Sequence, residues 1–414
     1  MNKPEIRFEG FNDEWEKQKL GEIAEVIDGD RGVNYPSSDD FNEYGHTLFL
    51  SATNITKNGF LLDSCQYINE EKSLSMGNGK LQLNDVVLTS RGSLGHVAWY
   101  HNEIHEKVPN SRINSGMLLL RANNNTSPGF IEQYLKSFIG QKQITTISFG
   151  SAQPQLTKKD VYNYFIVIPK DLKEQCIIGN FFHSLDDTIS FKKQQCEQTA
   201  NIKKAMLEKM FTKKGENVPE IRFDGFNDEW GKRKLKDMIE YKNGKGHEDK
   251  QSEYGKYELI NLNSISIDGG LKDSGKFIDE TNETLLLNDL VMILSDVAHG
   301  DLLGRVAIIP ENNKYVLNQR VALLRPNETV IPLYLFFHIN AHQEYFKSQG
   351  AGMAQLNISR GSVENFESYV PTEKEEQIAI GNFFHSLDTL IEAQQQEIDK
   401  LQNIKKALLN KMFV

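Results

Sequence analysis

The sequence opens with a twelve-residue motif that returns almost unchanged 215 residues later. PEIRFEGFNDEW at residues 4–15 recurs as PEIRFDGFNDEW at residues 219–230. The one difference, Glu9 against Asp224, exchanges one carboxylate for another. Duplication on this scale predicts a chain of two related units, each large enough to bury its own core.

The ends of the two copies match better than their middles. GNFFHSLD at residues 179–186 recurs at residues 381–388, NIKKA follows in both copies, and each copy closes with Met-Phe. The middles keep only short matches, such as LNDVV (83–87) against LNDLV (287–291). This arrangement is typical of a protein that performs one generic task twice and one specific task in two versions.

The middles are predicted to mix strands and helices. Short apolar segments rich in β-branched residues and bounded by turns, such as DVVLTS and VALLRP, are typical of strands. Residues 130–139 and 333–348 carry helical spacing instead. Each middle ends in a strand that stops at Pro169 or Pro371.

The ends of both copies are predicted to be long helices. A 4-3 spacing without proline or glycine runs in the second copy through Leu387, Ile391, Gln394, Ile398, Leu401, Lys405, Leu408 and Met412, and in the first through Leu185, Ile189, Lys192, Cys196, Thr199, Lys203, Met206 and Met210. Two matching stripes favour a coiled coil in which the helices pack on each other. The alternative is that each helix packs on its own domain, as most amphipathic helices do.

Composition and motifs exclude several classes of protein. The sequence contains no apolar run long enough to span a membrane and no apolar core of a signal peptide. Its three cysteines, Cys65, Cys176 and Cys196, are widely spaced, which favours a reducing cytoplasm. We find no catalytic constellation and no set of metal ligands. GLKDSGKF imitates a phosphate-binding loop, but Phe277 stands where Ser or Thr would bind magnesium.

Side chains suited to reading DNA gather at the predicted loops of both middles. Arg reads guanine and Asn or Gln reads adenine by paired hydrogen bonds, whereas Lys suits phosphates. On this ground we predict DNA binding by Ser90, Arg91, Ser93, Arg112, Asn114, Gln153, Gln155 and Lys158 in the first middle, and by Ser295, His299, Gln319, Arg320, Gln355, Asn357 and Arg360 in the second. The alternative is an ordinary set of solvated loop residues.

Together these motifs resemble the specificity (S) subunit of type I restriction–modification systems. The resemblance rests on the duplicated opening motif and on the run I-P…Q-x-x-I-x-x-F-F-x-x-L-D at residues 168–186. That run recurs at residues 370–388, where Val370 replaces the isoleucine. The resemblance covers nearly the whole chain.

The resemblance implies an α+β fold with two mixed α/β target recognition domains, separated and followed by long helices. The helices are expected to form an antiparallel coiled coil, so that the duplication has pseudo-twofold symmetry. The expected segments are a first recognition domain at 1–170, a central helical spacer and methyltransferase-docking region at 171–215, a second recognition domain at 216–371, and a C-terminal spacer and docking region at 372–414.

The resemblance also implies a function and partners. Each recognition domain would read one half of a bipartite site in double-stranded DNA, and the helices would set the spacer. Two methyltransferase (M) subunits would methylate adenine N6 with S-adenosylmethionine, and two restriction (R) subunits would cleave DNA with ATP and Mg. This chain would be non-catalytic and would hold no cofactor. Phe181, Phe182, Phe383 and Phe384 are predicted to bind partners, or to plug each helix onto its own domain.

The formal net charge of −10 argues against simple electrostatic binding of DNA. The resemblance answers this objection if M subunits supply much of the phosphate contact. Three other readings stay open: a duplicated protein-interaction adaptor, a specificity subunit of another restriction class, and a fused enzyme with unfamiliar motifs.

Overall fold

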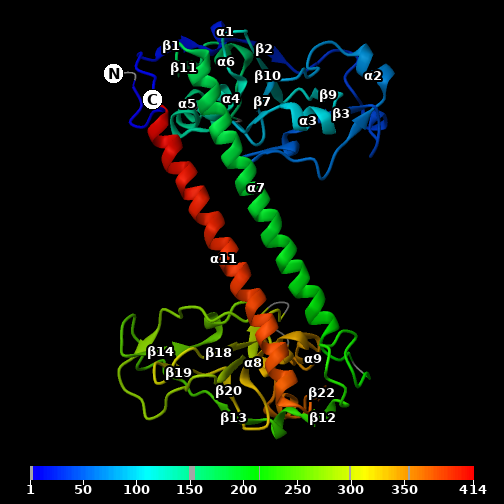
Figure 1. Ribbon diagram of the computed structural model, residues 1–414, viewed down its shortest axis with the longest axis vertical. Helices are drawn as coiled ribbons and strands as arrows, with labels where there is room; N and C mark the ends of the chain where they lie inside the picture. Colours follow the sequence, from blue (N-terminus) through cyan, green and yellow to red (C-terminus); the bar gives the residue numbers. More distant parts are fainter. Residues whose placement is uncertain (1–2, 149–153, 214, 298–299, 353–354) are drawn as a thin grey trace. The chain divides into compact units, whose positions relative to one another are not determined.

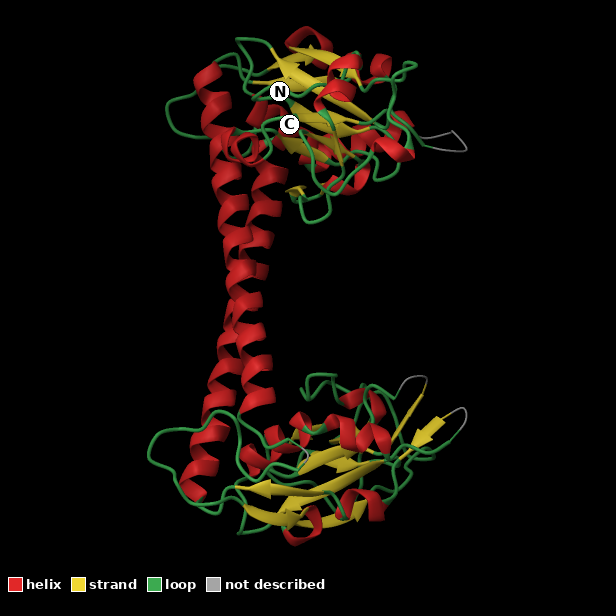
Figure 2. Cartoon of the chain, turned by 90° about the vertical axis from the view of Figure 1, so that its right-hand side faces the viewer, coloured by secondary structure: helices red, strands yellow, loops and turns green. Residues whose placement is uncertain are grey.

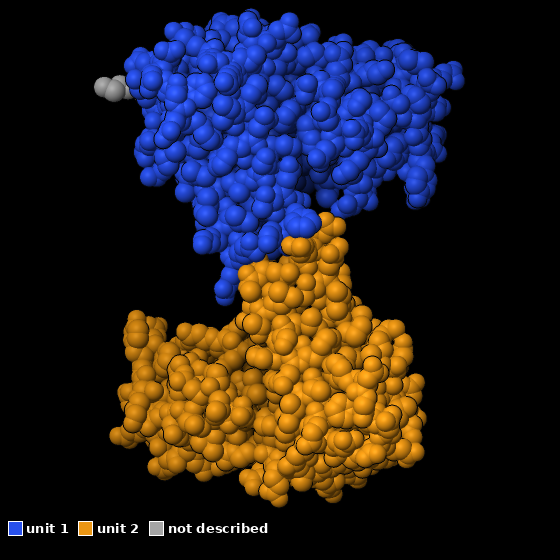
Figure 3. All heavy atoms as spheres, in the orientation of Figure 1, with its two compact units in different colours: residues 1–193, 396–414 blue, residues 194–395 orange. Residues whose placement is uncertain are grey.

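The computed structural model describes the whole chain except residues 1–2, 149–153, 214, 298–299 and 353–354. The chain divides into two compact units, which Figure 3 colours separately. Unit 1 contains residues 1–193 and 396–414, and unit 2 contains residues 194–395. Each unit therefore combines one middle of the sequence, the start of one long helix and the end of the other.

Unit 1 is built on a four-stranded antiparallel sheet in the order β2–β10–β7–β8 (Figures 1 and 2). Successive side chains of a strand point to opposite faces, so Val86 and Leu88 enter one core cluster while Val87 enters another. The sheet strands are β2 (Ala24–Asp28), β7 (Val86–Thr89), β8 (Val97–Trp99) and β10 (Met117–Ala122).

The first of these clusters lies against helix α4 (Pro128–Lys136), and the second lies against a three-stranded sheet in the order β6–β3–β9. The other elements of unit 1 are β1 (Glu16–Lys19), α1 (Leu20–Ile23), β3 (Thr47–Leu50), β4 (Ile55–Thr56), β5 (Gly59–Phe60), β6 (Tyr67–Ile68), α2 (Glu70–Ser75), α3 (Asn102–Lys107), β9 (Ser111–Ile113), α5 (Phe138–Ser148), α6 (Lys158–Tyr162) and β11 (Phe165–Ile168).

Unit 2 repeats this plan with a four-stranded sheet in the order β13–β20–β16–β18 and a three-stranded sheet in the order β15–β14–β19. The strands are β12 (Gly231–Lys234), β13 (Ile239–Asn243), β14 (Tyr257–Ile260), β15 (Phe277–Ile278), β16 (Leu290–Ile293), β17 (Ser295–Val297), β18 (Val306–Ile308), β19 (Tyr315–Leu317), β20 (Val321–Pro326), β21 (Gln355–Asn357) and β22 (Glu367–Val370). The helices are α8 (Pro332–Ala341), α9 (Gln343–Ser348) and α10 (Arg360–Glu364). The predicted duplication and mixed α and β fold are confirmed.

The two predicted long helices are α7 (Leu172–Lys209) and α11 (Lys374–Met412). In unit 1 the start of α7 runs antiparallel to the end of α11, since Asp186 pairs with Lys405 and Lys192 pairs with Glu397 at 2.9 Å. In unit 2 the end of α7 runs antiparallel to the start of α11, where Lys203 pairs with Asp388. The Asp of each GNFFHSLD motif therefore pairs with the first Lys of the opposite copy's NIKKA motif.

The repeated opening motif fastens the start of each long helix to its unit. In unit 1 the Arg7 guanidinium donates to both oxygens of Glu174 at 2.7 and 2.8 Å, and Trp15 Nε1 donates to Glu174 Oε1 at 3.3 Å. Glu174 is buried in the first turn of α7. Arg222, Trp230 and Glu376 form the same contacts in unit 2. The motif is therefore explained by contacts inside each unit.

The closing Met-Phe of each copy completes a core. In unit 1 the Phe413 ring lies 5.7 Å from Phe182 and 6.5 Å from Trp15, measured between ring centroids. The two chain ends meet there, and Ile6 N donates to Lys411 O at 3.1 Å (Figure 1). In unit 2 Phe211 stacks on Phe384 at 5.6 Å.

Phe182 and Phe384 are fully buried in these cores, so the prediction that they bind a partner directly is wrong for both. Phe181 is 37% exposed and Phe383 is half-buried, with their rings against Phe8 and Phe223. Neighbouring residues on a helix face different directions, so one Phe of each pair enters the core and the other lies near the surface. No described helix is both long and apolar enough to cross a membrane.

Candidate nucleic-acid interface

In unit 1 the loops that follow β2 and β7 meet the loop that precedes β10 at one end of the central sheet. Ser90 N donates to Gly116 O at 2.9 Å, and Leu156 N donates to Ser90 O at 3.0 Å. Gly29 lies so close to this junction that a Cβ there would come within 2.1 Å of Asn114 O. The backbone of four separate segments is thus fixed in one place.

Unit 2 holds the same backbone frame. Leu294 N donates to Arg320 O at 2.9 Å, and Ile358 N donates to Leu294 O at 2.8 Å. Gly244 takes the place of Gly29, and a Cβ at that residue would come within 1.7 Å of Asn318 O. These hydrogen bonds join positions equivalent to those of unit 1.

The side chains on this shared frame differ between the units. The equivalent pairs, with the unit 1 residue first, are Arg91 and Ser295, Ser115 and Gln319, Gly116 and Arg320, and Gln155 and Asn357. Different donors and acceptors are therefore held by equivalent backbone hydrogen bonds, although the turn differs locally, since Arg320 is in the left-handed region and Gly116 is not. Such a frame suits recognition of two different ligands of the same general shape.

The structure brings several predicted residues of unit 1 together. Arg91 is exposed, and its Nε donates to Gln155 Oε1 at 3.1 Å. Asn114 Oδ1 accepts from Gly116 N at 2.9 Å, which orders the loop before β10. Ser93 and Lys158 are exposed, and Lys158 begins α6 directly after the N-cap Thr157.

Arg112 and Ser90 are corrections to the predicted set, because both are buried. The Arg112 guanidinium donates to Ser73 Oγ and to the carbonyl oxygens of Met76, Gly77 and Asn78 at 3.0 to 3.3 Å. Burial lowers the pKa of this guanidinium below its ordinary value. Arg112 thus fixes the segment after α2, and its donors are not available to a base edge.

In unit 2 the predicted residues form a hydrogen-bonded group on the β17–β21 ribbon. Ser295 Oγ donates to Asn357 Oδ1 at 2.7 Å and accepts from Gln355 Nε2. Ser295 itself is buried, whereas Asn357 is exposed at the surface of the ribbon. We therefore assign Ser295 a supporting place behind Gln355 and Asn357 and correct its predicted direct contact.

Arg320 and Gln319 lie on the loop before β20, and both are exposed. Gln319 Nε2 donates to the Glu248 carboxylate. Arg320 has a φ of 66°, in the left-handed region that residues other than Gly, Asn and Asp rarely adopt. Arg360 begins α10, where it pairs with Glu364 at 2.8 Å and lies over the Tyr241 ring. The predicted Gln153 and His299 lie outside the described residues.

Sequence reasoning missed the loops that follow β2 and β13. Arg31 is exposed on the first of these loops and donates to Ser115 O at 3.2 Å. The Gly32 and Gly77 backbone N–H groups both donate to Asp30, and the Gly32 contact contributes most to lowering the pKa of that carboxyl. The glycine that directly follows each strand, Gly29 or Gly244, was the signal available in the sequence.

The corresponding loop of unit 2 borders a pocket of about 730 Å³. Its lining includes Lys242, Lys245, His247, Lys250 and Arg325, together with two acidic residues, Glu280 and Glu283. Lys242 pairs with Glu283, so part of this positive charge is neutralised within the unit. Among the described residues there is no group of three or more His, Cys, Asp or Glu side chains that could hold a metal ion.

Comparison with known proteins gives one consistent family. The family described as type I restriction modification DNA specificity domain matches residues 12–200 and again residues 227–403. The "Putative type I restriction enzyme MjaX specificity subunit" of Methanocaldococcus jannaschii is 25% identical over 418 residues, covering 96% of this chain and 92% of that protein. The MjaVIII specificity subunit of the same organism is 24% identical over 278 residues, covering 63% of this chain and 64% of that protein.

A solved structure shows the same fold. The S subunit of a type I restriction–modification system from M. genitalium aligns with a TM-score of 0.65 and 15% sequence identity. The alignment covers 100% of this chain and 99% of that one. The two matches to the family fall on the two copies found in the sequence.

Proposed function

Because this chain belongs to the family of type I restriction modification DNA specificity domains, we propose that each of its units reads one half of a bipartite DNA site. The observation that carries the proposal is the shared backbone frame with different side chains in the two units. A common frame would approach the duplex in the same way twice, while different side chains would select different bases.

Polar groups that lie exposed or half-buried on the frame are the proposed base-reading residues. In unit 1 these are Arg91, Asn114 and Gln155, with Ser93 and the newly found Arg31 beside them. In unit 2 they are Gln319, Arg320, Gln355 and Asn357. Lys158 and Arg360 occupy equivalent positions at the start of α6 and α10, which suits contact with phosphate groups.

Arg320 is the proposed reader of a guanine in the second half-site. A residue in the left-handed region costs about 1–2 kcal/mol unless it is glycine, and strain of this kind gathers at functional positions. The equivalent residue in unit 1, Gly116, lies outside the left-handed region, so this backbone conformation is a feature of unit 2. The exposed guanidinium has the paired donors that recognise guanine O6 and N7.

The remaining parts of the proposed complex are other subunits. Two M subunits would bind this chain and methylate adenine N6, and two R subunits would add ATP-dependent cleavage. S-adenosylmethionine, ATP and Mg would belong to those subunits, and this chain would act without catalysis in the cytoplasm. The M subunits would also supply phosphate contacts that a chain of net charge −10 lacks.

The long helices are the proposed ruler for the gap between the half-sites. Leu387 to Met412 is 26 residues, or about 39 Å at ~1.5 Å per residue. One turn of the DNA groove is roughly 34–36 Å. Insertion or deletion of a few helical residues should therefore change the gap but leave both half-sites intact.

The direct test is to co-express this chain with its cognate M subunit and to map N6-methyladenine in the host DNA. We expect methylation at one two-part motif with a fixed gap. A stable complex that leaves adenine unmodified would contradict the proposal and would favour a protein-interaction adaptor. Methyl transfer by the purified chain alone would favour the fused enzyme.

A further inference from the structure

The turns before β10 and β20 differ between the units in the state of one peptide group. In unit 1 the turn consists of residues 114–117, and Met117 N donates to Asn114 O at 3.3 Å across it. In unit 2 the equivalent turn consists of residues 318–321. The peptide group that joins the second and third residues of each turn is called the middle peptide below.

Both polar atoms of the middle peptide are held in unit 1. Its N–H belongs to Gly116 and donates to Asn114 Oδ1 at 2.9 Å. Its C=O belongs to Ser115 and accepts from Arg31 Nη2 at 3.2 Å. Gly116 lies outside the left-handed region, as is typical of a type I turn, which favours asparagine at its first position. The turn of unit 1 is therefore fixed in one state by two side chains.

The middle peptide of unit 2 lacks both of these contacts. Arg320 has a φ of 66° while Gln319 is outside the left-handed region, which is the type II pattern. Relative to type I, the middle peptide of a type II turn is turned over by roughly 180°. Asn318 is 8% exposed, and its buried Oδ1 has no hydrogen-bond partner among the described residues. Gly246 stands in the place of Arg31 and has no side chain to donate.

One rotation would remove two unfavourable features of the unit 2 turn. Arginine is strained in the left-handed region, and a buried acceptor without a donor destabilises the folded state. Turning the middle peptide over would return Arg320 to an ordinary φ and bring its N–H to Asn318 Oδ1. The bond from Leu294 N to Arg320 O can persist, because Gly116 O accepts the equivalent bond in unit 1.

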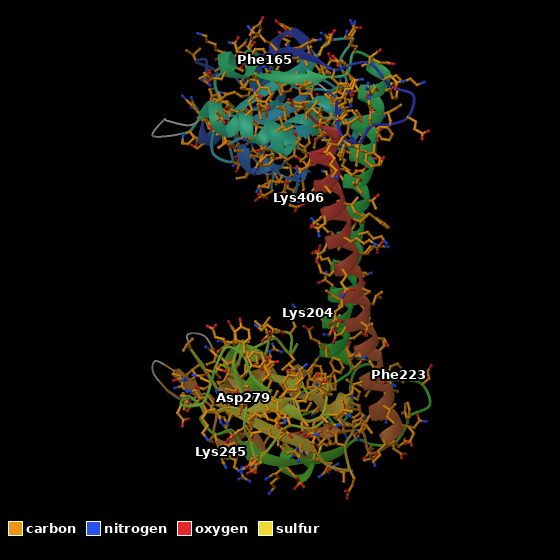
Figure 4. All side chains as sticks on the ribbon, turned by 90° about the vertical axis from the view of Figure 1, so that its left-hand side faces the viewer. Phe165, Lys204, Phe223, Lys245, Asp279 and Lys406 are labelled. Atoms are coloured by element: carbon orange, nitrogen blue, oxygen red, sulfur yellow. The ribbon has the colours of Figure 1, made fainter. Side chains whose placement is uncertain are left out.

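Contacts from the loop after β13 hold the turn in its present state. Gln319 Nε2 donates to the carboxylate of Glu248, which is an exposed residue of that loop. The backbone of Lys245, which Figure 4 labels in unit 2, pairs with that of Asn318. The pocket of about 730 Å³ beside this loop leaves space for it to shift. A ligand that engages Gln319 would compete with Glu248 and release the turn.

We propose that the middle peptide of unit 2 turns over when the second half-site binds, and that Asn318 is the positioning residue that holds it there. The proposal rests on the proposed function and adds a reading group to it. Turning over places the Gln319 carbonyl where the Ser115 carbonyl of unit 1 accepts from Arg31. Because unit 2 has glycine in place of that arginine, the carbonyl accepts instead from the amino group of an adenine or cytosine. DNA thereby binds one state of the turn better than the other, which is what shifts such an equilibrium.

The first test follows the Arg320 amide by hydrogen exchange in the full chain bound to its cognate M subunit. A duplex that contains the methylated site should protect this amide by about tenfold, as expected for one new hydrogen bond. Asn318→Ala should abolish the protection. Asn318→Asp, which keeps an acceptor oxygen in the same place, should retain it. A duplex altered only in the second half-site should give no protection.

Asn114→Ala is the matched control for a purely structural role. It removes a hydrogen bond that exists without DNA, so the Gly116 amide of the free chain should exchange at least about threefold faster. Asn318→Ala removes an acceptor that has no partner in the free chain. Exchange within residues 318–321 should therefore be unchanged in that variant until DNA is added.

Two further variants and readouts sharpen the test. Glu248→Ala removes the contact that holds Gln319, so the Arg320 amide should be partly protected before DNA is added. Asn318→Ala should lower discrimination at one position of the second half-site by about three- to tenfold in kcat/KM for methylation. Discrimination in the first half-site should not change. Asn318→Asp should restore the lost discrimination.

Two results would overturn the proposal. Protection of the Arg320 amide could survive Asn318→Ala, or a structure of the wild-type complex with its DNA site could show Arg320 still at a positive φ. The second result needs no variant, so misfolding of a variant cannot obscure it. A wild-type complex that recognises no two-part site would instead overturn the proposed function itself, so the two failures are distinguishable.

Discussion

The junction between the recognition fold and the long helices is polar in unit 1 and aromatic in unit 2. In α4, Glu132 and Lys136 form a buried ion pair at 2.8 Å, and Gln133 donates to Asp186 of α7 at 3.4 Å. The equivalent positions of α8 hold Phe336 and Phe337. The Phe337 ring lies 5.3 Å from that of Phe384 and is covered by Lys203.

Both junctions nevertheless keep one ion pair between the helices, Asp186 with Lys405 in unit 1 and Asp388 with Lys203 in unit 2. The comparison teaches which contacts the duplicated scaffold needs and which can change. The opening motif, the inter-helix ion pair and the closing Phe are common to both units. The side chains that lie between these contacts are polar in unit 1 and aromatic in unit 2. The stability of the two units should therefore respond differently to equivalent substitutions and to acid.

The largest expected difference comes from removing one polar partner. Lys136→Ala leaves the Glu132 carboxylate buried without its cation, which should cost unit 1 about 3–5 kcal/mol. Asn340→Ala at the equivalent position of unit 2 removes two hydrogen bonds to Val306, at 3.0 and 3.2 Å, and should cost about 1–3 kcal/mol. Hydrogen exchange of α4 and α8 measures the stability lost in each unit. Equal losses in the two variants would contradict the expected difference between the two junctions.

A smaller difference is expected at the glycine of each GNFFHSLD motif. A Cβ on Gly179 would come within 2.8 Å of the α4 backbone at Gly129, whereas a Cβ on Gly381 would meet Tyr334 N at 3.1 Å. Gly179→Ala should therefore destabilise unit 1 by about 1–3 kcal/mol. Gly381→Ala should cost less than about 1 kcal/mol, since alanine also favours the helix. Urea denaturation gives the free energy of unfolding of each variant. A Gly179→Ala protein more stable than the wild type would contradict the close approach of Gly179 to the α4 backbone.

Acidification should affect the two units at different pH values. Burial holds the pKa of His338 in unit 2 well below its ordinary value of 6.5, so the folded state keeps this ring neutral. The unfolded chain protonates first as the pH falls below about 6.5, and unit 2 loses stability from that point downward. A His338→Gln variant should lose this dependence.

Unit 1 should begin to lose stability at a lower pH than unit 2. Burial would raise the pKa of Glu132, but the nearby Lys136 outweighs it, and the pKa lies below its ordinary value of 4.5. The stability gained from this carboxylate is present above pH 4.5 and is lost as the pH falls toward the folded pKa. Hydrogen exchange of each unit between pH 7 and pH 4 separates the two acid responses. Loss of stability at the same pH in both units would contradict this account.

The smallest effect on stability, but a clear one on specificity, is expected for Arg320→Gly. Relief of the left-handed backbone and the greater freedom of glycine in the unfolded chain act in opposite directions, so stability should change by less than about 1 kcal/mol. Loss of the guanidinium should reduce the discrimination against wrong bases at one position of the second half-site by about 1–3 kcal/mol. Methylation mapping of the variant checks this, and an unchanged motif would remove Arg320 from the reading residues.

Much of the architecture could be predicted from the sequence because repeats and hydrophobic spacing are local patterns. The duplication, the mixed α and β middles and the long helices with a 4-3 stripe all follow from such patterns. The stripe pairs the two helices, since Lys192 and Lys203 each form an ion pair with the opposite helix. Its last residues enter the core of the opposite copy's domain: Met210 lies in the core of unit 2 and Met412 in the core of unit 1.

The use of particular side chains could not be predicted in the same way, since it depends on contacts between distant segments. Arginine is seldom buried, so nothing local marks Arg112 as the support of a loop 35 residues away. The repeated Phe pair gave no sign of which ring enters the core. The opening motif was recognisable only as a repeat, and its sequence did not reveal that Arg7 and Trp15 hold Glu174, 159 residues from Trp15.

The central claim, that each unit reads its own half-site, is tested most directly by exchanging one recognition domain. Residues 231–365 would be replaced by the corresponding domain of another member of the family, and the chimaera co-expressed with the same M subunit. Mapping of N6-methyladenine should then give a motif with one new half, the other half unchanged and the same gap. A motif in which both halves change, or in which neither does, would contradict the account.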